Sequence, residues 1–185
     1  MALEPSCGAV FRNELTNMLP HDENAKRLAR QTFTLGEFLA THATDWEMPR
    51  LERTALVHLH CHQRATSDTD CDRKVLDRLG LDYEVLDTGC CGLAGSFGYE
   101  RGERYEVSIK AGEQVLLPRV RAASPHTLII TDGFSCHSQI EHRTERLPLH
   151  LAQVIQMALH DGPNGPGTPL PEQRYVGEPA AMSRG

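Results

Sequence analysis

Apolar residues in this chain are concentrated in three short runs, separated by longer segments in which apolar positions recur every three or four residues. The runs are rich in β-branched and aliphatic side chains, which predicts buried strands at 54–61, 83–86 and 127–131. The periodic segments predict helices at 70–79, 101–122 and 149–160. Strands that alternate with helices indicate an α/β fold, with a parallel sheet, right-handed crossovers and flanking helices in two or three layers.

The first 42 residues predict two helices ahead of this core. One follows a turn at residues 4–6, and the other spans about 23–42. Helical spacing predicts that they bury one set of apolar side chains each: Val10, Phe11, Leu15 and Met18 in the first, and Ala25, Leu28, Ala29, Phe33, Leu35, Phe38 and Leu39 in the second.

Proline and glycine mark the ends of several predicted elements. Gly80 closes the helix at 70–79, and Pro118 is expected to bend or break the helix at 101–122. From Asp161 onward, five prolines and five glycines are scattered through 25 residues. Little apolar surface is available there to offset the entropy of ordering, which predicts a mobile tail at 161–185.

Composition narrows the class of protein. A length of 185 residues suits one ordinary domain, and a net charge of −6 with scattered basic residues argues against a nucleic-acid partner. The start lacks the pattern of a secretory signal, and no run approaches the roughly 20 apolar residues that span a bilayer, so we predict a cytoplasmic protein. In a reducing compartment, six cysteines indicate metal binding or redox chemistry rather than disulfides.

Four cysteines follow the three predicted strands. Cys61 ends the first strand, Cys90 and Cys91 follow the second, and Cys136 follows the third. Because the carboxyl ends of parallel strands meet at one edge of a sheet, these thiols are expected to converge. Free buried thiols are the alternative reading, but four of them at one edge would be an improbable coincidence.

The loop around Cys90 and Cys91 contains four glycines between residues 89 and 98. Adjacent cysteines make a strained disulfide, whereas two adjacent thiolates can bind different iron atoms of one cluster. Glycine lets the backbone approach a bound group closely, so Gly89, Gly92 and Gly95 are candidates for residues that wrap a cofactor. The glycine spacing does not fit a nucleotide-phosphate loop.

Other cysteines and histidines are weaker candidates. Cys7 lies near a helix N-terminus, where a thiolate is favoured, and Cys71 is expected to be a packed thiol. Strand alternation is expected to turn His58 and His60 away from the thiol of Cys61. Two further histidines directly follow predicted ligands and are candidates for a supporting role or a substitute ligand: His62 and His137.

Three stretches together resemble the cysteine-rich CCG domain of iron–sulfur oxidoreductases: His60-Cys61-His62-Gln63, residues 89–99 with Gly89-Cys90-Cys91-Gly92, and residues 132–140 with Asp132-Gly133-Phe134-Ser135-Cys136. That family includes the heterodisulfide reductase B subunit, the iron–sulfur subunit of glycolate oxidase, lactate-utilisation proteins and the C-terminal region of FAD-linked 2-hydroxy-acid oxidases. The similarity covers about residues 1–160 and is greatest to the flavin-oxidase branch.

The resemblance implies a 4Fe–4S cluster held by Cys61, Cys90, Cys91 and Cys136, which receives electrons from FAD on a partner that oxidises glycolate, D-lactate or D-2-hydroxyglutarate. Gln139 replaces the last cysteine of the family's Cys-x-x-Cys element, so a five-cysteine non-cubane cluster is not expected. The resemblance also implies peripheral membrane association through the complex, and exposed apolar surface predicts self-association or a hetero-oligomer.

A weak repeat between residues 3–7 and residues 132–136 gives the resemblance a further implication. Residues 1–42 then read as the remnant of a preceding CCG unit, and residues 54–160 as the C-terminal half of a duplicated domain. Two other functions stay open from the residues alone. One is a structural zinc module that docks on a flavoprotein, and the other is a thiol-disulfide protein that uses Cys90 and Cys91.

Overall fold

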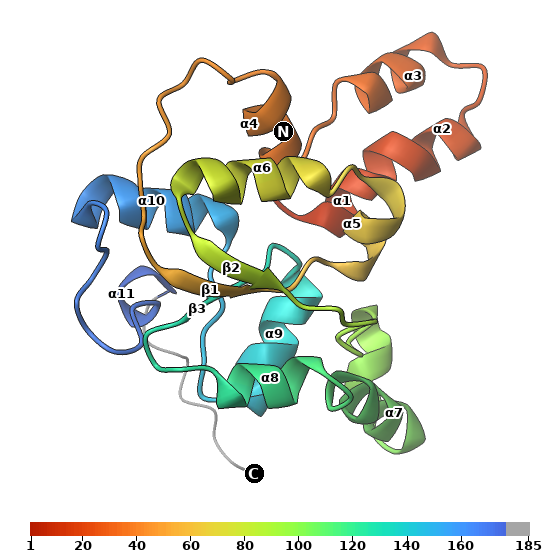
Figure 1. Cartoon of the computed structure of the whole chain (residues 1–185). Helices are drawn as coiled ribbons and strands as arrows, with labels where there is room; N and C mark the ends of the chain where they lie inside the picture. The colour runs from red at the N-terminus through yellow and green to blue at the C-terminus, as the bar shows by residue number, and fades with distance from the viewer. Residues whose placement is uncertain (177–185) are drawn as a thin grey trace.

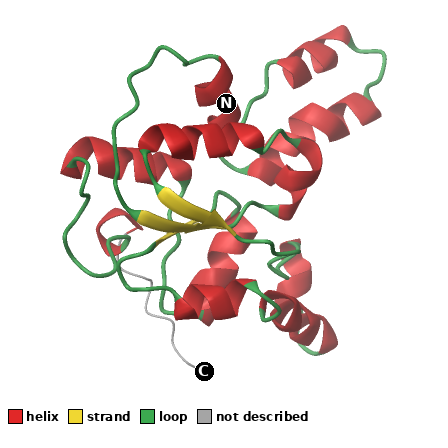
Figure 2. Ribbon diagram, in the orientation of Figure 1, coloured by secondary structure: helices red, strands yellow, loops and turns green. Residues whose placement is uncertain are grey.

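The computed structural model describes residues 1–176 and is organised around a small parallel sheet (Figures 1 and 2). Its strands are β1 (Thr54–Val57), β2 (Asp82–Val85) and β3 (Leu128–Ile130), in the order β2-β1-β3. Both pairings with β1 are parallel. The predicted α/β class and parallel sheet are confirmed, although each predicted strand was longer than or offset from the observed one.

Helices cover both faces of the sheet and make three layers (Figure 1). One face carries α4 (Leu35–Thr41), α6 (Asp70–Leu79) and α10 (Leu151–Asp161), and the other carries α8 (Leu116–Ala122) and α9 (Phe134–Arg143). Side chains on β1 alternate between the layers: Ala55 and Val57 pack on the first side and Leu56 on the second. The central strand β1 and the strand β3 are therefore buried on both faces, whereas the edge strand β2 is exposed or partly buried at every position.

Shorter helices surround the carboxyl edge of the sheet and the two chain ends. They are α1 (Pro5–Ala9), the π-helical turn η1 (Val10–Glu14), α2 (Leu15–Met18), α3 (Glu23–Arg30), α5 (Cys61–Thr66), the 3-10 turn η2 (Gly95–Tyr99), α7 (Glu103–Gly112) and α11 (Gln173–Val176). The α2–α3 hairpin projects away from the sheet (Figure 1).

The N-terminal region differs from its prediction in two ways. The segment predicted as one helix at 23–42 is two helices, because Thr34 caps α4 and pairs reciprocally with Glu37 in a capping box. The turn η1 and the projecting hairpin also leave several apolar side chains largely exposed: Val10 42%, Phe11 45%, Met18 78% and Leu28 43%. The predicted helical periodicity of this region is correct, but these four side chains do not belong to the hydrophobic core.

The predicted helix at 101–122 is also divided. The break falls at residues 113–115, and Pro118 lies inside the first turn of α8, where its missing N–H costs nothing. Gly80 closes α6 in a left-handed conformation with φ +80°, as predicted.

The segment after α10 lies against the core as far as Val176. Arg146 binds Glu172 at 2.5 Å, with side-chain exposures of only 7% and 1%. The backbone of Tyr175 also accepts a hydrogen bond from Gln153 at 3.1 Å. Residues 161–176 thus make polar contacts with the core, and the mobility of the tail stays a prediction. Residues 177–185 lie outside the described part of the chain.

None of the helices within residues 1–176 combines the length and the apolar character that a membrane crossing requires.

Candidate functional site

The four predicted ligands meet at the carboxyl edge of the sheet. Cys61 is the first residue of α5, four positions beyond the end of β1, and Cys136 lies in the first turn of α9 beyond β3. Cys90 and Cys91 occupy the loop between β2 and η2. The crossovers place these elements side by side, although 75 residues of sequence separate Cys61 from Cys136.

The thiols form two close pairs, one open and one buried. The Sγ atoms of Cys61 and Cys90 are 4.0 Å apart, and Cys90 is exposed. Cys91 and Cys136 are 2% and 0% exposed and share a hydrogen bond. The backbone N–H of Gly92 donates to the Sγ of Cys90 at 3.3 Å. The site therefore has a dry side within the fold and a side that faces solvent.

The shared hydrogen bond sets the acidity of the buried pair. The bond from Cys136 lowers the pKa of Cys91 to about 7, even though burial opposes the change. The same bond, together with burial, raises the pKa of Cys136. Burial also raises the pKa of Cys90 to about 11, against the opposing effect of the Gly92 N–H. Of these three thiols, Cys91 releases its proton most readily.

The sulfur atoms are not grouped around a single point. Within residues 1–176, no group of three or more His, Cys, Asp or Glu side chains is arranged to hold one metal ion. Four sulfur atoms bound to one zinc ion at about 2.3 Å would lie about 3.8 Å from one another. The Sγ atoms of Cys61 and Cys90, 4.0 Å apart, are close to that spacing. Thiols that come from three strand ends suit a polynuclear centre, whose ligands bind different atoms.

The glycines of the loop have different local roles. Gly92 has φ +95°, and a Cβ there would lie 2.0 Å from the carbonyl oxygen of Ser108, so this glycine lets the loop lie directly against α7. Gly95 has φ +57° with open space beside it, and Gly89 is likewise uncrowded. The structure thus gives Gly92 a packing role, and a cofactor role for Gly89, Gly92 and Gly95 stays a prediction.

Gln139 ties the loop to the neighbouring helices. Its side chain is 2% exposed, and its Nε2 donates to the carbonyl oxygens of Cys91 at 3.1 Å and Ser108 at 3.3 Å. Gln139 is therefore a hydrogen-bond donor that fixes the backbone at Cys91. This role depends on three segments that are distant in the sequence, and sequence reasoning missed it.

We expect Gln139→Ala to lower the free energy of unfolding by about 1–3 kcal/mol, because it leaves the Cys91 and Ser108 carbonyls without their donor in a buried place. Urea denaturation followed by circular dichroism measures the change. Gln156→Ala, at an exposed position of α10, is the matched control. Equal stability of the two variants would contradict the role of this side chain.

The chain is similar in sequence to parts of several longer dehydrogenases. It is 27% identical over 158 residues to a D-2-hydroxyglutarate dehydrogenase of Pseudomonas putida, which covers 84% of this chain and 15% of the relative. It is 32% identical over 103 residues to one of the subunits of the anaerobic glycerol-3-phosphate dehydrogenase of Escherichia coli, which covers 55% of this chain and 25% of the relative.

A D-2-hydroxyglutarate dehydrogenase of Haemophilus influenzae matches at 25% identity over 134 residues, or 72% of this chain and 11% of the relative. No protein-family model and no solved structure matches the chain. The chain thus spans a quarter or less of the length of these relatives. At this level, the likeness relates it to oxidoreductases that are dehydrogenases or dehydrogenase subunits.

The histidines near the site have partners other than sulfur. His58 is 1% exposed, and its Nδ1 lies 2.7 Å from the Thr88 hydroxyl, while burial lowers its pKa to about 4. The Nε2 of His60 lies 3.4 Å from the Ser6 hydroxyl. The Nδ1 of His137 lies 3.7 Å from a carboxylate oxygen of Glu141. These contacts agree with histidines that support the structure around the site.

Cys7 and Cys71 have neighbours different from those of the four converging thiols. Cys7 lies near the N-terminus of α1, as predicted. The Glu4 carboxylate accepts a hydrogen bond from the backbone N–H of Cys7 at 2.7 Å and raises the pKa of the Cys7 thiol. The expectation of a thiolate at Cys7 is therefore wrong. Cys71 is buried, with its Sγ 3.6 Å from a carboxylate oxygen of Asp68, which agrees with a packed thiol.

Sequence reasoning missed the buried carboxyl group of Asp72 beside this edge of the sheet and gave no role to the carboxyl group of Asp132, which is partly buried. Asp72 is 5% exposed and accepts a hydrogen bond from Gln63 at 2.8 Å. The sequence does carry a signal for the burial of Asp72. Asp72 lies three positions before Val75 and seven before Leu79, so helical spacing places it on the buried side of α6. An acidic residue on an apolar helix face is a candidate for a functional group.

Proposed function

We propose that this chain is an iron–sulfur electron-transfer module that works with a flavin-dependent 2-hydroxy-acid dehydrogenase. Cys61, Cys90, Cys91 and Cys136 would hold a cluster of the 4Fe–4S type. The observation that carries the proposal is the convergence of these thiols, from three strand ends, at one edge of the sheet. A cluster accepts and releases single electrons, at a potential set by burial and by hydrogen bonds to its sulfur ligands.

The donor set and its surroundings fit such a centre. Thiolates are the usual ligands of iron–sulfur clusters, and the two pairs can reach different iron atoms. Cys91 and Cys136 lie on the dry side, and the Gly92 N–H already points at the sulfur of Cys90. An N–H directed at sulfur favours its negative charge and would raise the potential of a bound cluster.

The open side of the site supports contact with an electron donor. Cys90 is exposed, and Phe134, at the start of the helix that carries Cys136, is 71% exposed. An exposed aromatic side chain beside the site suits docking of another protein surface. The likeness to D-2-hydroxyglutarate dehydrogenases supports a 2-hydroxy acid as the substrate class of the whole assembly. Its oxidation would take place on the flavin partner.

The test is elemental analysis of protein purified without oxygen. We expect about four iron atoms and four acid-labile sulfides per chain, with a broad brown absorbance that bleaches when dithionite is added. Bound iron should also protect Cys61 and Cys90 from alkylation, whereas the metal-free protein should be modified at both. Stoichiometric zinc in a colourless protein would overturn the proposal and select a structural zinc module.

One observation favours a second candidate, a thiol-disulfide protein. The sulfur atoms of Cys61 and Cys90 are 4.0 Å apart and need only a small movement to reach bonding distance. In that case, the protein should contain no metal, and mild oxidation should join Cys61 to Cys90 in a disulfide that mass spectrometry of a digest detects. The raised pKa of Cys90 weighs against this candidate, because the thiolate is the attacking species.

A further inference from the structure

Two buried polar atoms just beyond the ends of β1 and β3 have no hydrogen-bond partner in the described part of the chain. They are Nε2 of His58 and the hydroxyl oxygen of Thr131. The two residues are only 1% and 2% exposed. Nearly every buried donor or acceptor in a folded protein has a partner, because an unpaired polar group is costly in the interior. Two unpartnered atoms side by side therefore indicate a group that they bind.

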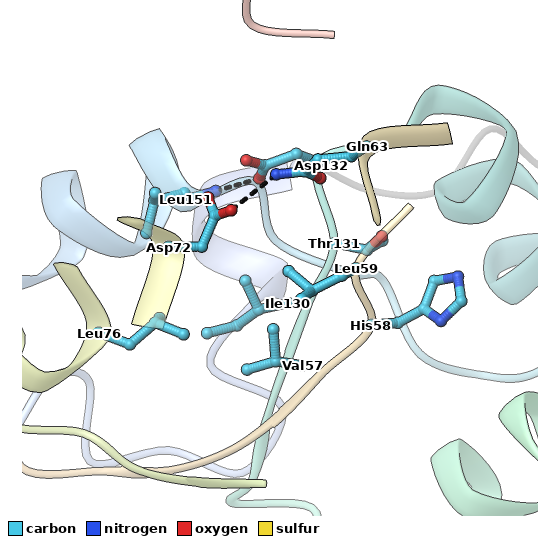
Figure 3. A pocket seen from close by; sticks show the side chains of 10 residues that line it. All are labelled: Val57, His58, Leu59, Gln63, Asp72, Leu76, Ile130, Thr131, Asp132 and Leu151. Carbon is cyan, nitrogen blue, oxygen red and sulfur yellow. Dashed lines mark hydrogen bonds between the residues drawn. The ribbon is translucent and has the colours of Figure 1, made fainter. Parts of the chain in front are cut away.

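The two side chains are neighbours on one face of the sheet. In the parallel pairing of β1 with β3, Val57 lies opposite Ile130. The backbone N–H of His58 then donates to the carbonyl oxygen of Ile130 at 2.9 Å, which continues the pairing. His58 and Thr131 thus occupy adjacent places one step further along. Figure 3 shows both side chains on the side of the strands that is opposite to Asp72.

This face of the sheet also carries the two buried thiols. Leu56, two residues before His58, packs in the same hydrophobic cluster as Cys91 and Cys136. Residues two apart on a strand share a face, so His58 points toward that layer, one step nearer to the carboxyl edge. The same holds for Thr131, because the residue two positions before it on β3 belongs to this cluster as well. Both unpartnered atoms therefore face the dry side of the sulfur site.

The contact with Thr88 decides which ring nitrogen of His58 carries the proton. Nδ1 lies 2.7 Å from the Thr88 hydroxyl, which has no second side-chain partner within residues 1–176. A hydroxyl that donates to Nδ1 is satisfied and leaves the ring proton on Nε2, whereas the reverse direction leaves the hydroxyl proton without an acceptor. Burial keeps the ring neutral, because it lowers the pKa of His58 to about 4. His58 therefore presents one N–H, at Nε2.

Sulfur is the acceptor that suits these two donors at this place. Thiolates and inorganic sulfide carry negative charge and accept hydrogen bonds from N–H and O–H groups, and such bonds are stronger than those between neutral partners. Cys91 and Cys136 lie in the layer that the donors face. A sulfur-rich group held by these two residues would satisfy both unpartnered atoms, so the chain's own residues fit the cluster named above.

We propose that His58 and Thr131 donate hydrogen bonds to the sulfur atoms held at Cys91 and Cys136, and so favour the reduced form of the site. This inference rests on the proposed function, because it requires a sulfur-bound group that accepts an electron. Hydrogen bonds to sulfur stabilise added negative charge, which raises the reduction potential. The electron comes from the flavin partner, and no covalent bond forms or breaks.

Matched variants at Thr131 separate the hydroxyl from the shape of the side chain. Thr131→Val removes the donor and keeps the branched shape, whereas Thr131→Ser keeps the donor. In cluster-loaded Thr131→Val, we expect the equilibrium constant for reduction to fall about tenfold, which lowers the midpoint potential by about 59 mV. Thr131→Ser should stay near the wild-type potential. Thr54→Val, at the exposed start of β1, is the control and should not change it. Redox titration followed by visible absorbance measures all four proteins.

A second pair of variants applies the same test to His58. The amide nitrogen of Gln can take the place of Nε2, whereas Leu has no donor, so His58→Leu should lower the potential and His58→Gln should restore most of it. Cluster-loaded variants that all keep the wild-type potential would overturn the hydrogen bonds and leave the proposed function intact. A wild-type protein that binds no cluster would overturn both.

Unfolding of the metal-free full chain distinguishes a role at the sulfur site from a role in folding. The Thr131 hydroxyl has no partner within the chain as described, so its removal should not cost stability. We expect the urea midpoint of metal-free Thr131→Val to equal or exceed that of wild type. A lower midpoint in that variant would assign the hydroxyl to the fold and contradict the proposal. Nitrogen NMR should also place the His58 ring proton on Nε2, and a proton on Nδ1 would overturn the donor role of this ring.

Discussion

Cys91→Ser is expected to abolish iron and sulfide binding, while Cys71→Ser retains both in full. Cys91 is 2% exposed, shares a hydrogen bond with Cys136, and has a pKa of about 7, so it is the thiol best prepared to bind iron as a thiolate. Serine keeps the size of the side chain but is a poor ligand for iron. Iron and sulfide content per chain, together with the visible spectrum, measure the effect after purification without oxygen.

Cys71 is a stringent control because it is equally a buried cysteine, 4% exposed, within the same domain. Its thiol faces Asp68 rather than the other sulfur atoms. Circular dichroism should show both serine variants folded, so that a loss of iron reports on ligation. Full cluster content in Cys91→Ser would refute the ligand assignment, whatever the content of Cys71→Ser.

Gly92→Ala is expected to lower the free energy of unfolding by about 3–5 kcal/mol. The residue has φ +95°, and a Cβ would lie 2.0 Å from a backbone oxygen of Ser108, which cannot rotate away as a side chain can. The loop or α7 must move, and the hydrogen bond from Gly92 to the sulfur of Cys90 moves with it. Urea denaturation of the chain as purified measures the loss.

Gly95→Ala separates the clash from the strain of a left-handed backbone. Gly95 also has a positive φ, of +57°, but nothing lies within 4 Å of its Cβ position. We expect a cost of only about 1–2 kcal/mol, the strain alone. A similar cost at both positions would show that the contact between the loop and α7 is not what makes Gly92 necessary.

The convergence of the cysteines could be predicted from sequence because it depends on topology alone. Parallel strands place their carboxyl ends at one edge, so the prediction survives errors of several residues in strand length. The observed β1 ends at Val57, well before the predicted end at Cys61, yet Cys61 still reaches the edge as the start of α5.

Other features could not be predicted because they depend on which surfaces meet. Helical periodicity identified the apolar face of the N-terminal helices, but nothing in that pattern says whether a face has a partner, and Met18 is 78% exposed. The packing of residues 161–176 rests on the buried pair of Arg146 and Glu172, which composition does not reveal. Asp72 was recognisable only by its place on the buried face of α6.

The position of Gln139 limits how this site can change during evolution. A cysteine there would add a fifth sulfur, but the same substitution would remove the amide that holds the carbonyls of Cys91 and Ser108. Gln139→Cys would therefore add a thiol and remove a hydrogen-bond donor in one substitution. A protein that carries it would need another donor nearby for these two carbonyl groups. The number of thiols at this edge and the rigidity of the loop would therefore change together.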